Sequence, residues 1–215
     1  MYQLYYCRGK ASLTPHMLLE ELDVPYQLVP IDVKNNQHKT AQYLALNPMG
    51  QIPLLIDLDV KITETAAICL YLSDKHPEKN FAPALGTTKR GLFYKWLFFL
   101  TSNLQAELMI YFNPQHYSES DKAGVKVRAY ENISGMLDLI ENQLVEYQSF
   151  ATGPYFLGKH CSAVDLLLLM LSRWTSDLAY PARVRPCLNK LLNLVVSRPA
   201  VIRAFNDENI VAPYF

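Results

Sequence analysis

The sequence predicts a chain of two parts, an α/β sandwich with a mixed sheet followed by an all-helical bundle. The first eighty residues alternate between patterns typical of strands and of helices. Residues 76–88 contain two prolines and a glycine, and their apolar residues show no periodic spacing. Nearly everything beyond has the period of helices. We therefore expect one domain at 1–78, a linker at 79–87 and a helical domain at 88–215.

Each strand and helix of the first part is predicted from the spacing of its apolar residues and from the residues at which it ends. Short apolar and aromatic runs predict strands, and prolines stop two of the helices, before Pro25 and before Pro77. The predicted order is strand, helix, strand, short helix, strand, strand, helix. The strands are expected at 3–7, 26–33, 54–57 and 60–62, and the helices through 17–22, 40–46 and 64–75.

Helical periodicity dominates the second part. The segment 92–112 is apolar almost all round, so it needs cover on more than one side. Ser162 and Asp165 form a capping pair at the start of an apolar helix, and we expect this pair to serve folding and not chemistry. One buried helical face is predicted from Ala129, Ile133, Met136, Leu137, Ile140 and Leu144.

Composition excludes several classes of protein. A chain of 215 residues with half of them apolar can bury a core, so it is not disordered. Its formal net charge is zero, which disfavours nucleic acid or an anionic membrane as the main partner. No apolar run suits a membrane span, and the start lacks the layout of a signal peptide. The four cysteines are scattered, without a zinc spacing, so we expect a cytoplasmic protein without a metal.

Two neighbouring segments carry the strongest functional signal. The first is a loop that runs through Pro53 into a short strand, and its extended backbone suits pairing with a peptide-like ligand. The second is a helix start with Thr63 as the expected N-cap, where free amides and the Thr65 hydroxyl suit a carboxylate. Together they predict a site for a small peptide with a free carboxylate, such as glutathione. The segments are 47–55 and 63–68.

The same residues resemble a known family. Asn-Pro-x-Gly-Gln-Ile-Pro followed by Glu-Thr-x-Ala-Ile is similar to the glutathione-binding half of the glutathione S-transferase superfamily. The resemblance implies the glutathione transferase fold, with a thioredoxin-like first domain and a cis bond before Pro53. It also implies that Ile52 pairs with the cysteinyl backbone of glutathione and that Glu64 and Thr65 hold its γ-glutamyl end. Gln51 is a further candidate for the glutathione backbone.

The junction of the first strand and helix resembles the bacterial beta class, whose motif is Tyr-Tyr-x-Pro-Gly-x-Cys-Ser-Leu-x-Pro-His. Here Ala11 replaces the cysteine of that motif, and Gln105 replaces a histidine of the second domain. A disulfide stored at position 11 is therefore excluded, and hydroxyl chemistry remains. Ser12 and Tyr6 are the candidates that stabilise the thiolate. A helix cap for Ser12 and strand packing for Tyr6 are the alternatives, and both stay open.

Other polar residues of this junction are expected to be structural. We expect Cys7 to be a buried, inert thiol and Lys10 to be a solvated loop residue. His16 is expected to be packed and hydrogen-bonded, not to act as a base.

The resemblance implies a cytosolic homodimer that uses glutathione as co-substrate and adds its thiolate to small hydrophobic electrophiles. Two alternatives use the same site: a glutathione-dependent peroxidase or disulfide reductase, and a regulatory protein that binds glutathione without catalysis. The electrophile pocket is expected between the two domains, with Phe99, Asn103, Gln105, Tyr111 and Trp174 as candidates.

Overall fold

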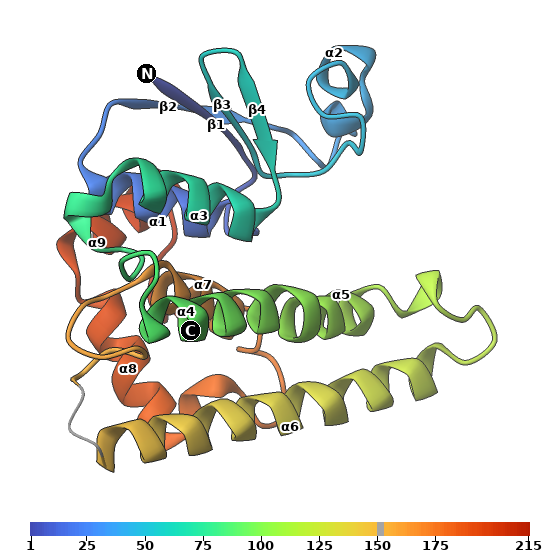
Figure 1. Cartoon of the computed structure of the whole chain (residues 1–215). Helices are drawn as coiled ribbons and strands as arrows, with labels where there is room; N and C mark the ends of the chain where they lie inside the picture. The colour runs from blue at the N-terminus through green and yellow to red at the C-terminus, as the bar shows by residue number, and fades with distance from the viewer. Residues whose placement is uncertain (150–152) are drawn as a thin grey trace. The chain divides into compact units, whose positions relative to one another are not determined.

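The computed structural model describes residues 1–149 and 153–215 and divides into two compact units (Figure 1). Met1–Ala82 and Ser197–Ala212 form the first unit, and Pro83–Val196 with Pro213–Phe215 form the second. The chain first passes between the units inside the stretch read as a linker. Ser197–Ala212 departs from the predicted division, because its helix packs on the first helix of the chain.

The first unit is built on a four-stranded mixed sheet with the order β2-β1-β3-β4. β1 pairs parallel with β2 and antiparallel with β3, and β3 and β4 form an antiparallel hairpin. The order of elements is the predicted one. The strands are β1 (Tyr2–Tyr6), β2 (Tyr26–Pro30), β3 (Leu54–Asp57) and β4 (Val60–Thr63). The helices are α1 (Leu13–Leu22), α2 (Ala41–Leu44), α3 (Thr65–Lys75) and, from the end of the chain, α9 (Pro199–Asp207).

Apolar side chains pack on both faces of this sheet. Figure 1 shows α1 and α3 side by side along one face, and both contribute fully buried residues such as Leu18 and Ile68. On the other face Tyr43 of α2 packs with Ile31 and Leu54. Burial on two faces fixes the ends of β1 and β3, next to which the functional loops begin.

The second unit is helical in the described residues. The expected helix at 92–112 is continuous but has a π-helical turn at Leu100–Gln105 between α4 and α5. The predicted capping pair is confirmed, since Ser162 and Asp165 form a capping box and α7 is buried along nearly its whole length. The helices are α4 (Thr88–Phe99), α5 (Ala106–Phe112), α6 (Lys122–Ser149), α7 (Ala163–Arg173) and α8 (Pro186–Val196).

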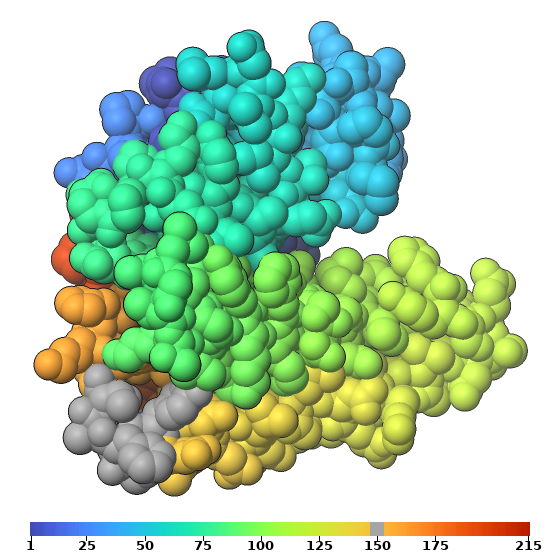
Figure 2. All heavy atoms as spheres, viewed as in Figure 1, coloured from blue at the N-terminus to red at the C-terminus, as the bar shows by residue number. Residues whose placement is uncertain are grey.

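The face of the molecule drawn in Figure 2 shows which elements meet solvent. On this face the α2 segment, β4 and α3 lie at the surface of the first unit, and α4, α5 and α6 lie at the surface of the second. In the described part of the chain no helix combines the length and apolar content that a bilayer crossing requires.

Candidate functional site

The loop before β3 carries a cis peptide bond between Ile52 and Pro53, as expected from the sequence. The loop is held from inside, because the Tyr43 hydroxyl and the Asn47 side-chain amide donate to the Gln51 carbonyl at 2.6 and 2.8 Å. The next residue is different. Within the described residues no protein group bonds to the amide or the carbonyl of Ile52. Its backbone is therefore available to a strand-like ligand.

Gly50 allows this loop to approach the turn that follows β2. It has a φ of +59°, and a Cβ there would lie 2.8 Å from the His38 carbonyl oxygen. The Lys39 ammonium reaches the same point and lies 3.3 Å from the Gly50 carbonyl oxygen. A cation therefore stands beside the loop, a feature that the sequence motif does not include.

The N-cap of α3 lies one residue later than expected. Thr63 is the last residue of β4, and Glu64 occupies the cap position with a φ of +66°, so the expected N-cap at Thr63 is wrong. The Glu64 side chain does not cap this helix, and no side chain in the described part of the chain bonds to its first amides. The Glu64 carboxylate is exposed, while Thr65 is buried and its hydroxyl donates to the Ala11 carbonyl at 3.4 Å. Uncapped amides beside an exposed carboxylate suit a ligand that carries both an anionic and a cationic group.

The contact between Thr65 and Ala11 also joins α3 to the loop that precedes α1. Here Ser12 is fully buried, and its hydroxyl donates to the Cys7 carbonyl at 3.0 Å and accepts from the Cys7 amide at 3.1 Å. Its side chain makes no cap bond to α1, so the helix-cap alternative is wrong. The proton of the Ser12 hydroxyl is therefore engaged in a hydrogen bond within the loop.

Tyr6 is the other hydroxyl candidate. It is half-buried at the end of β1, and its ring centroid lies 6.4 Å from that of His16. Burial, followed by the carboxylates of Glu208 and Asp207, raises the pKa of Tyr6, so the phenol keeps its proton for donation. Burial likewise raises the pKa of the Cys7 thiol, which favours its inert, protonated form.

His16 is fully buried and hydrogen-bonded, as expected. Its Nδ1 lies 2.9 Å from Glu208 Oε1, and its Nε2 lies 3.1 Å from the Tyr26 hydroxyl. Glu208 also accepts from the Gly9 amide at 2.7 Å. Sequence reasoning missed Glu208, because a glutamate at the end of the chain gives no local sign of a partner in the first helix.

The residues expected to line an electrophile pocket lie on four segments of the second unit: α4, the π-helical turn, α5 and the end of α7. Asn103 and Gln105 belong to the π-helical turn; Asn103 is exposed, and the Gln105 side-chain oxygen is buried without a hydrogen-bond partner. Trp174 follows α7 and packs against the ring of Phe112, a residue that the sequence analysis did not name. The two remaining candidates pack locally: Phe99 on Trp96 and Tyr111 under Lys126.

Comparison with known proteins extends these observations. A family model described as the N-terminal domain of glutathione S-transferase matches residues 1–74. BphK, a bacterial GST solved as a ternary complex, is 32% identical with a TM-score of 0.82, and the match covers 96% of this chain and 99% of BphK.

Two further solved structures match this chain with similar coverage and TM-score. A beta-class glutathione S-transferase from Sphingomonas chungbukensis is 26% identical over 97% of this chain and 100% of its own, with a TM-score of 0.83. A sphingomonad glutathione S-transferase complexed with glutathione is 25% identical over 97% and 100%, with a TM-score of 0.82. Because the family model matches most of the first unit and BphK matches the chain almost end to end at more than 30% identity, this protein belongs to the glutathione S-transferase superfamily.

Proposed function

We propose that this protein binds glutathione on its first unit and transfers the glutathione thiolate to small hydrophobic electrophiles. The observation that carries the proposal is the open backbone at Ile52, next to the cis Pro53 and within the same unit as the uncapped start of α3. A tripeptide with a free α-amino acid end needs both features. The glutathione bound to the sphingomonad relative supports the same ligand for this chain.

The proposal gives the ligand a direction. The γ-glutamyl carboxylate faces the amides of α3, and its ammonium group faces the Glu64 carboxylate. The cysteinyl backbone pairs with Ile52, and Gln51 borders it. The glycyl carboxylate then extends past Ile52 toward Gly50, where the Lys39 ammonium supplies a counter-charge. Lys39 is therefore the additional glutathione-binding residue in the proposal.

The thiol of this ligand faces the loop before α1, because Thr65 bonds to Ala11 in that loop. A free cysteine thiol has a pKa of about 8.5, so the site must favour the thiolate. The amino end of α1 contributes partial positive charge, and a hydroxyl from Tyr6 or Ser12 supplies the hydrogen bond. With the thiolate positioned, transfer to carbon needs an apolar pocket, for which Phe99, Asn103, Gln105, Tyr111 and Trp174 are the candidates.

Assembly and location complete the proposal. We infer a homodimer, since α4 and α5 expose the large apolar side chains of Phe98, Met109 and Phe112. A sedimentation experiment that finds only monomer at assay concentration would contradict the inferred homodimer. The four free cysteines fit a reducing cytoplasm.

The test measures binding and turnover separately. Calorimetry with glutathione gives affinity, and mixing the protein with glutathione and a dinitrohalobenzene gives conjugation. We expect Glu64→Gln to weaken glutathione binding about 10-fold, the effect of one charge-assisted hydrogen bond. Glu119→Gln, which changes an exposed carboxylate in the second unit, is the matched control and should bind like the parent. Absence of both binding and conjugation in the parent protein contradicts the proposal.

A second candidate function is glutathione binding without catalysis. The bonds of the Ser12 hydroxyl to Cys7 favour it, because they use the proton that a thiolate would need. Calorimetric binding of glutathione together with an absence of conjugation, over a panel of aromatic and alkyl electrophiles, would establish this candidate in place of the first.

A further inference from the structure

The contact between α1 and α9 gathers ionisable side chains that the proposed glutathione chemistry does not use. His16 and Glu20 come from α1, Asp207 ends α9, and Glu208 follows it. The side chains of His16 and Glu208 are fully buried, whereas that of Asp207 is 51% exposed. All four residues belong to the first unit.

Three of these residues can direct one ligand atom each at a common point. One ring nitrogen of His16 and one carboxylate oxygen each from Glu20 and Asp207 lie within 4.8 Å of one another, and His16 Nε2 is 3.7 Å from Asp207 Oδ2. Tetrahedral zinc bonds of about 2.0–2.2 Å hold neighbouring ligand atoms about 3.4 Å apart. Small side-chain movements would therefore bring all three atoms onto one ion.

The imidazole is already oriented for this task. Glu208 Oε1 lies 2.9 Å from His16 Nδ1, and Glu208 Oε2 is itself held by the Gly9 amide at 2.7 Å. A metal-binding histidine ordinarily donates its other ring N–H to a carboxylate, which fixes the ring and leaves the opposite nitrogen for the metal. Glu208 supplies that carboxylate, and His16 Nε2 faces the side of Glu20 and Asp207.

Charge favours a divalent cation at this point. Glu20, Asp207 and Glu208 bring three negative charges, and Arg203, which pairs with Glu20, brings one positive charge. A metal on Nε2 displaces the ring proton there, so the imidazole is then neutral and two negative charges remain, which a divalent ion would balance. The Tyr26 hydroxyl donates to Glu20 and lies 3.1 Å from His16 Nε2. Because the Tyr26 proton goes to Glu20, His16 Nε2–H donates to the Tyr26 oxygen, and a metal on Nε2 would displace that proton and this one contact.

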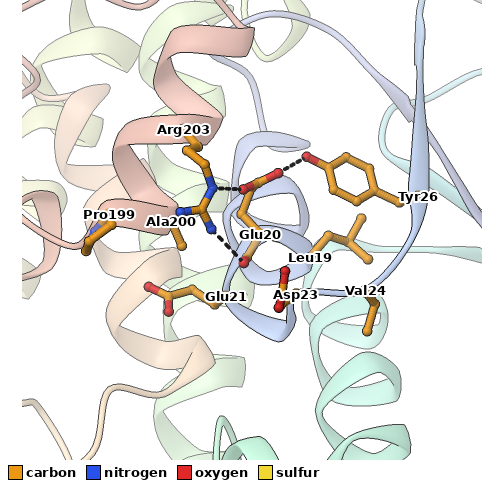
Figure 3. A pocket seen from close by; sticks show the side chains of 9 residues that line it. All are labelled: Leu19, Glu20, Glu21, Asp23, Val24, Tyr26, Pro199, Ala200 and Arg203. Atoms are coloured by element: carbon orange, nitrogen blue, oxygen red, sulfur yellow. Dashed lines mark hydrogen bonds and ion pairs between the residues drawn. The ribbon is translucent and has the colours of Figure 1, made fainter.

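The cluster borders an opening to solvent. A pocket of about 460 Å³ runs between α1 and α9, with Glu20, Tyr26 and Arg203 in its wall. Figure 3 shows the Glu20 carboxylate between the Tyr26 hydroxyl and the Arg203 guanidinium at this wall, bonded to both. An ion can enter from this side, or past the half-exposed Asp207.

We propose that His16, Glu20 and Asp207 form a binding site for Zn²⁺ that links α1 to α9, with water as the fourth ligand. One imidazole and two carboxylates in a compact set fit zinc, whereas Mg²⁺ prefers six oxygen ligands. The ligands come from opposite ends of the chain. No local spacing of residues therefore signals the site, and the sequence analysis expected no metal.

The test uses the full chain, freed of metal and titrated with Zn²⁺ in a calorimeter and with Co²⁺ in a spectrophotometer. We expect Zn²⁺ to bind once per chain and Co²⁺ to give visible d–d bands without the near-ultraviolet charge-transfer band of a thiolate ligand. Asp207→Asn should weaken Zn²⁺ at least 10-fold, and His16→Gln should abolish binding. Asp23→Asn is the matched control, because Asp23 lines the same pocket outside the cluster.

The variants keep the proposal open to contradiction. Asp207→Asn changes a half-exposed side chain and should fold even where the buried His16→Gln does not. No Zn²⁺ binding by the parent chain, equal binding by the Asp207→Asn and Asp23→Asn variants, or a thiolate band with Co²⁺ would each overturn the site. None of these results depends on glutathione, so the proposed function stands or falls separately.

Discussion

The Ser12 hydroxyl bonds both backbone groups of Cys7 and so closes the loop that joins β1 to α1. A hydroxyl at a helix start can cap the helix, bind a ligand or bond to its own loop, and the sequence does not distinguish these roles. Tyr6 retains a protonated phenol near the same loop. The Ser12 hydroxyl thus already donates its proton within the loop, whereas the Tyr6 phenol keeps its proton.

This division predicts the effect of two substitutions on the thiolate of bound glutathione. Tyr6→Phe should raise the pH at which thiolate absorbance appears, because it removes a hydrogen bond to the charged form. Ser12→Ala should instead lower the free energy of unfolding by about 1–3 kcal/mol, since two partly buried backbone groups of Cys7 lose their partner. An unshifted titration in Tyr6→Phe together with a raised one in Ser12→Ala would reverse the assignment.

A second prediction at this scale concerns Lys39, which lies 3.3 Å from the Gly50 carbonyl oxygen. Lys39→Ala should raise the KM for glutathione about 2–5-fold and leave kcat unchanged, because an exposed ion pair contributes about 0.5–1 kcal/mol. Lys61→Ala is the matched control, since Lys61 also donates to a backbone carbonyl, that of Ala45. An equal change in both variants would mean that the effect is not local to the loop.

Asp57 at the end of β3 gives a prediction for pH. The Lys75 ammonium, followed by the Tyr71 hydroxyl, lowers the pKa of Asp57 below its ordinary value. The folded carboxylate therefore binds fewer protons than the unfolded one, and its stabilisation is present above about pH 4 and is lost as the pH falls through the folded pKa. Urea midpoints of the parent and Asp57→Asn should differ near neutral pH and converge below pH about 4. Asp59→Asn, in the exposed turn, should follow the parent at every pH.

At the scale of elements, prediction from sequence succeeds where the signal is continuous along the chain. The loop through Pro53, the hairpin after it and the box at Ser162 and Asp165 each lie within a few residues, and each is present. The π-helical turn at Leu100–Gln105 was not predicted, because its residues have ordinary helical propensities. Glu64 replaced Thr63 as the cap residue because β4 continues through Thr63.

The box at α7 predicts the stability of its unit. The Asp165 carboxylate is buried and accepts from the Phe156 amide, the Ser162 amide and the Ser162 hydroxyl, each at 2.8 Å. Asp165→Asn replaces one acceptor oxygen by a donor and should lower the free energy of unfolding by about 2–3 kcal/mol. Asp177→Asn, an exposed change shortly after α7, is the control and should stay within about 0.5 kcal/mol. Similar urea midpoints for the two variants would contradict this account of α7.

For the whole molecule, the main departure from prediction is the place of α9. It packs on α1 through the pairs of Arg198 with Glu21 and of Arg203 with Glu20, and Glu208 after it accepts from the Gly9 amide in the loop before α1. No local pattern in the sequence indicates that α9 packs on α1. Because α9 packs on α1, the first unit is discontinuous in sequence and includes Ser197–Ala212.

This discontinuity predicts how fragments behave. Residues 1–82 alone should lack cooperative unfolding, because the buried His16 and the Gly9 amide lose Glu208, and α1 loses the cover of α9. The same fragment joined through a flexible linker to residues 197–212 should regain a cooperative transition. A fusion in which Glu208 is changed to Ala is the matched control and should unfold at lower urea, since it leaves a buried imidazole without its carboxylate partner. Cooperative unfolding of 1–82 alone, at the same midpoint as the fusion, would show that α9 is an appendage of the first unit and not part of its core.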